Sequence, residues 1–363
     1  MQFTILRQNL KSALDNVRST VKTNNHVEWS KMIKFNITPE NSDITAYDLE
    51  VGAISEIDAV TMESTEFLVE PDKLAALVSK MTGETIECDV DSNVMKMKCG
   101  RSKVKLPIQT ADNFPSIPSY ESADCFTLNG AKLAEMIRQT VYAVAQTDNK
   151  PVLRGELFEI SSNVFNLAAI DGHRLAVSKT AVSTSADYKF VVKGETLKSV
   201  AKLAKDVDVT VYPSKKHTVF DFGRNKIFTR LIEGDFVNYR GSIPENSTTE
   251  VKVNVRQLAE CLERFSLLID SKTKAPVKCT FRNGTLDMSI NSPHGEMQDY
   301  VDIDFAGNEV TIGFNVYFLL DALKAAETDM VKLCLNSGLS PMKILPAEGN
   351  DFVFLVLPVR LKD

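Results

Sequence analysis

The segment FTILRQNLKSAL, residues 3–14, has a counterpart 123 residues later in FTLNGAKLAEMI, residues 126–137. Each begins with a short β-rich run and continues with apolar residues spaced as on one face of a helix. A shared offset at separate places indicates an internal duplication. The same offset relates further landmarks, namely Phe67 and Phe190, Asp48 and Asp171, and the tetrapeptides 100–103 and 223–226.

Each copy is itself divided into two similar halves. A strand residue followed by apolar residues seven and eleven positions later occurs six times, beginning at Phe3, Phe67, Phe126, Phe190, Val251 and Ile312. We therefore expect six copies of strand, helix and about three strands. The helices are expected at 8–22, 72–80, 130–142, 195–205, 256–268 and 317–327. Alternating segments predict antiparallel strands within 43–57, 157–170 and 279–290, with a hairpin turn at Asn283-Gly284.

The predicted fold class is α+β, with three tandem domains that each contain a duplication. We place them at 1–120, 124–244 and 248–363, which is close to the commonest domain size. The polar segments 119–124 and 245–250 separate them as linkers.

Composition limits the functional classes. The chain has 363 residues, 44% of them hydrophobic and 25% charged, which is ordinary for a folded protein and excludes a wholly disordered one. It has no apolar run long enough to span a membrane, and charges interrupt its first residues, so we expect a cytoplasmic protein. The six cysteines lack metal or disulfide spacing and are expected to be reduced and mostly buried.

Positive charge is concentrated on the predicted helices, although the formal net charge of the chain is −6. In the fourth helix, Lys198, Lys202 and Lys205 share one face. Two interpretations stay open: these faces are simply solvated, or the repeats surround an axis and their helices form a basic wall. Such a wall would hold nucleic-acid phosphates without reading bases.

The segment DGHRL, 171–175, is the one stretch that suggests catalysis, because Asp171 and His173 could form an acid–base pair. Its repeat equivalent, DLEV at 48–51, has no histidine, which favours a strand-to-turn corner. Phosphate-binding glycine loops and zinc spacings are absent from the sequence. We expect no catalytic residues, no metal and no cofactor. A hydrolase using Asp171 and His173 and a protein-binding scaffold without DNA remain alternatives.

The segment FVFLVLPVRL, 352–361, is strongly apolar. Residues 352–356 predict a core strand, which Pro358 must end or confine to an edge. Leu357, Val359 and Leu361 then lack a strand that would bury them, and an exposed apolar patch of this kind is typical of a binding surface.

Together these features resemble the bacterial β sliding clamp family, the β subunit of DNA polymerase III. The most specific segments are 100–118, 167–179, 231–244, 312–323 and 357–361. The resemblance implies a DNA clamp fold in which two chains form a head-to-tail homodimeric ring, with helices lining the hole and sheets outside. It also implies a processivity factor with no catalytic activity that encircles double-stranded DNA without sequence preference. Partners would be the polymerase III α subunit, the clamp loader and other proteins with a clamp-binding motif.

The resemblance also implies site residues. The partner-peptide pocket would contain Leu153, Gly172, His173, Arg174, Leu175, Val237, Arg240, Ile243, Asn315, Phe318, Met342, Leu355, Val356, Leu357, Pro358, Val359, Arg360 and Leu361. We expect Arg174 and Arg360 at its rim, and Leu175, Val356, Leu357 and Pro358 at its floor. Val237, Gly241 and Ser242 depart from the family pattern.

We also expect two charged surfaces, one that contacts DNA and one that forms the dimer interface. DNA contact is expected from Lys11, Arg18, Lys22, Lys73, Lys80, Arg138, Lys198, Lys202 and Lys205 on or near the helices, and from Lys150 and Arg154 in a loop. The dimer interface would contain Lys73, Arg101, Lys103, Val104, Leu267, Leu268, Glu296 and Asp299, with opposite charges on the two ends of the chain.

Overall fold

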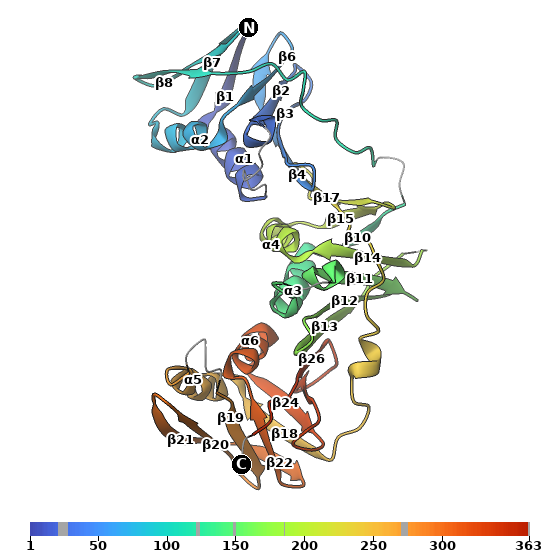
Figure 1. The fold of residues 1–363 in the computed structure, drawn as a ribbon. Coiled ribbons are helices and arrows are strands. Elements are labelled where there is room, and N and C mark those ends of the chain that lie inside the picture. Colours follow the sequence, from blue (N-terminus) through green and yellow to red (C-terminus); the bar gives the residue numbers. More distant parts are fainter. Residues whose placement is uncertain (21–27, 121–123, 148–149, 185, 270–274, 362–363) are drawn as a thin grey trace. The chain divides into compact units, whose positions relative to one another are not determined.

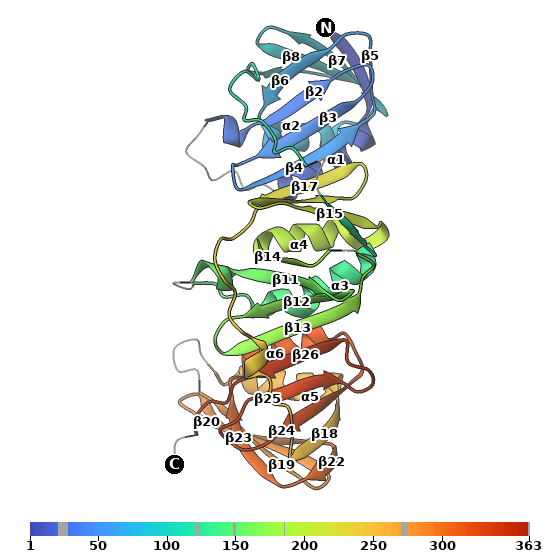
Figure 2. The same ribbon diagram turned by 90° about the vertical axis from the view of Figure 1, so that its right-hand side faces the viewer.

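The computed structural model describes residues 1–20, 28–120, 124–147, 150–184, 186–269 and 275–361. The chain forms two compact units, Met1–Ala134 with Ser199–Leu231, and Glu135–Lys198 with Ile232–Asp363. Figures 1 and 2 show the helices and strands of both units.

The six predicted helices are confirmed, each within two residues at its described ends. They are α1 (Arg7–Thr20), α2 (Pro71–Lys80), α3 (Gly130–Thr140), α4 (Gly194–Leu203), α5 (Val255–Ser266) and α6 (Val316–Ala326). The apolar stripe explains their placement, because Leu10, Leu14 and Val17 of α1 are buried while the intervening polar residues are not. No described helix is both long and apolar enough to cross a membrane.

Unit 1 contains two antiparallel sheets. The first has five strands in the order β5 (Ala59–Thr61), β1 (Gln2–Leu6), β7 (Thr85–Asp91), β8 (Val94–Cys99) and β9 (Ser102–Pro107). The second has eight, in the order β10 (Phe126–Leu128), β15 (Val209–Pro213), β16 (His217–Asp221), β17 (Asn225–Arg230), β4 (Val51–Ile57), β3 (Ser42–Tyr47), β2 (Ile33–Ile37) and β6 (Thr65–Val69).

Unit 2 also contains two antiparallel sheets. The larger has nine strands in the order β14 (Tyr188–Lys193), β11 (Gly155–Ser161), β12 (Val164–Ile170), β13 (Arg174–Ala181), β26 (Phe352–Val356), β25 (Met342–Pro346), β24 (Met330–Leu335), β18 (Thr249–Asn254) and β22 (Asp304–Gly307). The smaller has four, in the order β21 (Gly295–Asp302), β20 (Thr285–Ser292), β19 (Val277–Arg282) and β23 (Val310–Phe314).

The predicted six copies of strand, helix and three strands are confirmed, with β5 and β22 as short additions. The leading strands are exchanged within each pair of copies. For example, β6 pairs with β2 of the preceding copy, β14 with β11, and β23 with β19. The predicted turn at Asn283-Gly284 joins β19 to β20, and Gly284 adopts the left-handed φ of 86° that such turns require.

Two strand pairs join copies that we assign to neighbouring domains. In unit 1, β17 pairs with β4, and in unit 2, β13 pairs with β26. In each unit the helices and strands bury a large apolar core. The second of these strand pairs places the DGHRL segment beside the apolar C-terminal segment.

Candidate partner pocket and charged surfaces

The DGHRL segment forms a tight turn into β13. The Asp171 carboxylate accepts hydrogen bonds from the backbone N–H groups of His173 and Arg174, at 2.9 and 3.1 Å. Gly172 has a φ of 86°, in the left-handed region that favours glycine. The pseudo-equivalent turn repeats this geometry, because the Asp48 carboxylate accepts from the N–H groups two and three residues later and Leu49 adopts a φ of 74°. The turn therefore explains why an aspartate occurs at both positions.

His173 is not oriented as a general base on Asp171. In the described part of the chain, its imidazole stacks on the Phe318 ring, with centroids 5.7 Å apart, and makes no hydrogen bond to a carboxylate. The strand-to-turn interpretation of DGHRL is thus supported, and the geometry gives the hydrolase alternative no acid–base pair. Within that described part, no three His, Cys, Asp or Glu side chains cluster closely enough to hold a metal ion.

Arg174 lies inside the site rather than at its rim, which corrects the expectation from the sequence. Its guanidinium donates to Asp171, at 2.9 Å, and to Asp321 of α6. It also lies over the rings of Phe318 and Tyr142, at 4.7 and 5.4 Å from their centroids. Because the side chain is only 11% exposed and has two carboxylate partners, it fastens the turn to α6 and is not a free cation for a ligand.

A compact apolar cluster lies beside this turn, where the resemblance implies the floor of the partner pocket. Leu153, Leu175 and Leu355 are buried there, and Val237 and Ile243 pack against them partly exposed. Sequence reasoning missed other members of the cluster, including Phe236 and Tyr239. Both occur in the segment 235–244, which resembles the segment NFPSIP at 113–118 in the preceding repeat. The internal repeat was therefore the signal that could have found them.

Three expected pocket residues have other positions. Val356 and Met342 are paired neighbours in the sheet and face the main core of unit 2, at 0% and 2% exposed. Val356 therefore cannot form the accessible floor that we expected, because alternate residues of a strand point to opposite faces. Asn315 caps α6, since its side-chain oxygen accepts from the N–H of Tyr317 at 3.0 Å.

The C-terminal segment continues beyond β26 along the site. The Leu357 N–H donates to the His173 carbonyl at 2.9 Å, and the side chain of Leu357 is 37% exposed. Pro358, Val359 and Leu361 are half-buried, and Arg360 is exposed. Leu357 is thus the apolar residue of this segment that presents most of its surface to a ligand.

Arg240 lies over the ring of Tyr239, a member of the cluster, and also has an acidic partner. It forms an ion pair with Glu159, which accepts a further hydrogen bond from the Tyr239 hydroxyl at 2.9 Å. The hydrogen bond from Arg240 holds the pKa of Glu159 below its ordinary value. Arg240 remains 56% exposed, so it can still contact a ligand at the rim.

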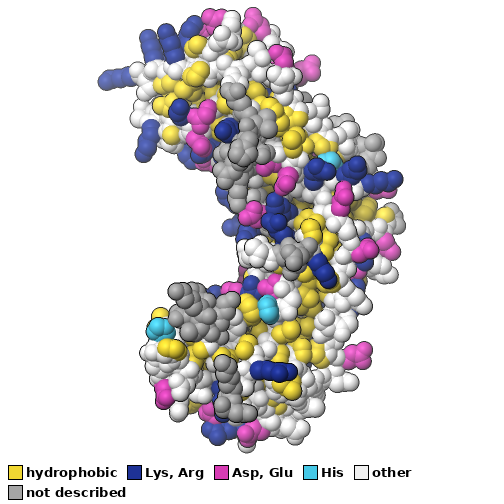
Figure 3. Space-filling view, viewed as in Figure 1, with side chains coloured by type: hydrophobic (Ala, Val, Ile, Leu, Met, Phe, Trp, Pro, Cys, Tyr) yellow, Lys and Arg dark blue, Asp and Glu magenta, His cyan; other side chains and the backbone are white. Residues whose placement is uncertain are grey.

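The helix cations divide into two groups. Lys11 and Arg18 have carboxylate partners, Asp15 at 2.8 Å and Asp72 at 2.5 Å. In contrast, Lys73, Lys80, Lys202 and Lys205 are exposed, and the structure records no carboxylate contact within 4.0 Å for any of these four among the residues it describes. Lys150 and Arg154 are likewise exposed, and Lys22 lies outside the described residues. Figure 3 shows basic and acidic side chains interspersed on the viewed face, so the positive charge there is patchy.

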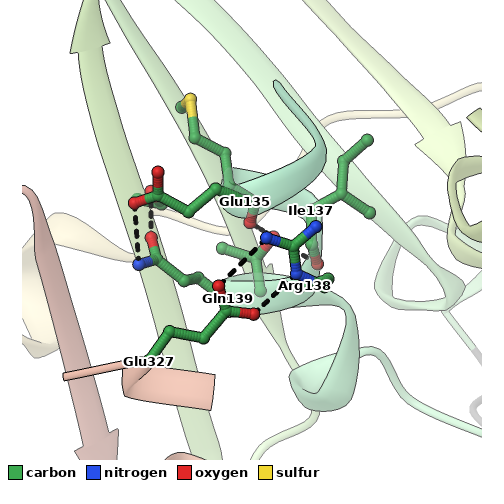
Figure 4. A network of polar contacts seen from close by, with 8 residues as sticks. Glu135, Ile137, Arg138, Gln139 and Glu327 are labelled. Atoms are coloured by element: carbon green, nitrogen blue, oxygen red, sulfur yellow. Dashed lines mark hydrogen bonds and ion pairs between the residues drawn. The ribbon is translucent and has the colours of Figure 1, made fainter. Parts of the chain in front are cut away.

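Arg138 has a defined structural partner. Figure 4 shows its guanidinium on α3 facing Glu327 at the end of α6, and the two are joined by hydrogen bonds of 2.6 and 3.0 Å. Glu327 has a left-handed φ of 51° at the C-cap of α6. This ion pair ties α3 to α6 and leaves Arg138 less available to phosphates than we expected from its position on a helix.

The expected interface residues lie on or near two sheet edges, one in each unit. In unit 1, β9 is an edge strand carrying the exposed Lys103 and the half-buried Val104, with Arg101 in the turn before it. In unit 2, β21 is an edge strand carrying Glu296 and Asp299, the latter paired with Arg264 at 2.5 Å. Near it Leu267 is 83% exposed, whereas Leu268 is half-buried.

Duplicated strand–helix–strand copies, with an apolar cluster beside the strand pair that joins two of them, define the architecture of a DNA sliding clamp. Three family models match along the chain: the N-terminal domain of the DNA polymerase III beta subunit at residues 1–118, its central domain at 127–238 and its C-terminal domain at 240–360. The chain belongs to the DNA polymerase III beta subunit family.

Similar proteins agree with this assignment. The beta sliding clamp of Haemophilus influenzae is 27% identical, over 99% of this chain and 100% of its own, and that of Bacillus subtilis is 26% identical over the same shares. Among solved structures, a putative DNA polymerase III beta subunit from Eubacterium rectale is 29% identical, with a TM-score of 0.93 over 99% of both chains. A sliding clamp from Pseudomonas aeruginosa is 26% identical, with a TM-score of 0.94 over 99% of this chain and 100% of its own. The function of the chain is that of a DNA sliding clamp in replication.

Proposed function

We propose that two copies of this chain associate head to tail into a ring that encircles duplex DNA and tethers the replicative polymerase in the cytoplasm. Each copy would contribute three domains, 1–120, 124–244 and 248–363. The ring acts by topology and not by catalysis, so weak contacts to phosphates suffice and sliding remains possible. The observation that carries this proposal is the match of all three family domains in order along the chain.

The two charged edges support the head-to-tail arrangement. A basic edge strand, β9, and an edge strand with acidic residues, β21, occur at different ends of one chain. Unpaired strand edges can pair with each other between chains, and opposite charges would select this pairing over like with like. Leu267, with 83% of its surface exposed, supplies an apolar contact for the same surface.

The pocket of unit 2 is the proposed site for short peptides from the polymerase III α subunit, the clamp loader and other partners. Its support is the apolar cluster around Leu175 and Leu355, with the exposed Leu357 and a rim formed by Arg240 and Arg360. A buried apolar anchor of the peptide would supply most of the binding energy.

Retention on DNA tests the ring. After loading onto a closed circle the protein should stay bound, and cutting the circle once should release it because a ring slides off a free end. Equal retention on the cut DNA would contradict the proposal.

Charge reversal tests the helix cations. Changing Lys202 and Lys205 to Glu should make DNA binding less dependent on salt. The slope of log affinity against log salt concentration should decrease in magnitude by about two, one for each lost phosphate contact. Reversal of Lys215 and Lys216, which are exposed in the turn between β15 and β16, is a control of equal charge change. The same loss in both variants would show that net charge, and not the helix surface, matters.

A further inference from the structure

The segment Leu357–Leu361, here called the tail, is hydrogen-bonded to the turn that precedes β13 and to a strand of the smaller sheet of unit 2. After the bond from Leu357 to His173, Pro358 has no N–H to donate, and the Val359 N–H donates to the Gly313 carbonyl at 2.8 Å. Gly313 lies in β23, an edge strand that pairs with β19 on its other side. The tail therefore covers part of a sheet edge and is anchored there by one backbone hydrogen bond.

The seat of the tail on β23 has no room for a side chain. A Cβ atom at Gly313 would lie 2.5 Å from the Val359 carbonyl oxygen and 2.8 Å from Cδ2 of Leu361. The first of these is a backbone atom, so the clash cannot be relieved by a change of rotamer in the tail.

The requirement for glycine at this position comes from the tail and not from the strand. Gly313 has no left-handed φ, and it pairs with Lys278 in regular antiparallel register. Alanine is therefore compatible with the backbone of β23 itself. A substitution here perturbs the tail first.

We propose that Gly313 is a positioning residue whose missing side chain seats the tail on β23 and thereby sets the affinity of the pocket for partner peptides. The inference rests on the proposed function of the pocket. Displacing Val359 would pull on Leu357, which is two residues away in the tail. Leu357 is exposed and follows the cluster residue Leu355 by two positions, the spacing of residues on one face of a strand. Gly313 itself touches the tail and not the ligand.

The test compares Gly313→Ala with a control at the same sheet edge. Gly338→Ala would place a Cβ 2.5 Å from the carbonyl oxygen of Thr311 in β23, so it disturbs this edge without contacting the tail. Gly313→Ala should increase hydrogen exchange of the Val359 amide about tenfold or more and weaken binding of a fluorescent clamp-motif peptide about tenfold. Gly338→Ala should leave both unchanged.

A third chain, lacking Val359–Asp363, separates seating from general destabilisation. In the truncated chain Gly313→Ala has no tail to displace, so it should not lower the thermal midpoint further, whereas in the full chain it should. An equal decrease of the thermal midpoint in both chains, or unchanged hydrogen exchange of the Val359 amide, would contradict the proposal that Gly313 positions the tail. If Gly313→Ala releases the tail but even the wild-type protein does not bind the peptide, the proposed function of the pocket is wrong. The proposed effect of Gly313 on affinity would then be wrong as well.

Discussion

Replacing Glu156 by Gln should remove a large pH dependence from the stability of unit 2. Glu156 is the second residue of β11 and is completely buried. One carboxylate oxygen contacts the Thr140 hydroxyl, and the other has no hydrogen-bond partner among the described residues. Burial raises the pKa of Glu156 from 4.5 to about 8, against the lowering effects of the Thr140 hydrogen bond and of Lys198.

The hydrogen bonds around Thr140 favour the protonated acid. The Thr140 hydroxyl has one proton and also lies 2.8 Å from the Met136 carbonyl, which can accept it. A protonated Glu156 can then donate to Thr140 Oγ1 while Thr140 donates to Met136. In the Glu156→Gln variant, the side-chain amide would donate in the same way without a titrating proton.

The sign and size of this pH dependence follow from the linkage between protonation and folding. Because the folded-state pKa of this acid is raised, its stabilisation is complete below pH 4.5 and is lost as the pH rises to about 8. Each pH unit in that window lowers the free energy of unfolding by about 1.4 kcal/mol. At pH 7 the free energy of unfolding of the wild-type chain should therefore be about 3 kcal/mol lower than below pH 4.5. Glu156→Gln should largely recover this difference.

Urea unfolding from pH 5 to pH 9 measures this difference, with Glu159→Gln as the control. The pKa of Glu159 is lowered by its hydrogen bond with Arg240, so its linkage acts as the pH falls below the ordinary value and adds no slope between pH 5 and 9. An unchanged slope in Glu156→Gln would refute the assignment of a neutral buried acid.

Three further substitutions test separate parts of the molecule. Leu49→Gly should raise the thermal midpoint, because removing a left-handed leucine relieves about 1 kcal/mol of backbone strain, whereas Leu49→Ala should give no increase. Changing Leu267 and Leu268 together to Asp should produce folded monomers in analytical ultracentrifugation, because charges would be buried at the apolar interface; an unchanged dimer at low concentration would contradict the interface assignment. In a fluorescent peptide titration, Leu175→Ala should lower affinity by more than tenfold and exceed the effect of Arg360→Ala, and the reverse order would place the binding energy at the rim.

The sequence alone determined the repeat, the helices and the unusual apolar tail. These features are local, because a helix shows its buried face as apolar residues three and four apart, and a repeated unit shows itself as a constant offset. The turn at Asp171 was readable for the same reason, since its carboxylate bonds only the N–H groups that follow directly.

Tertiary structure decided what these local units do together. The exchange of leading strands and the pairing of β13 with β26 depend on residues far apart in the chain, and no local spacing specifies which edges meet. From its sequence context Arg174 was expected at the rim of the pocket. In the structure it contacts Asp321 and Phe318 of α6, a helix far from it in sequence. Gly313 has the sequence context of an ordinary strand glycine. Its role comes from the tail, because a Cβ atom at this position would lie 2.5 Å from the Val359 carbonyl oxygen. Close packing between segments distant in sequence therefore determined the role of each of these residues.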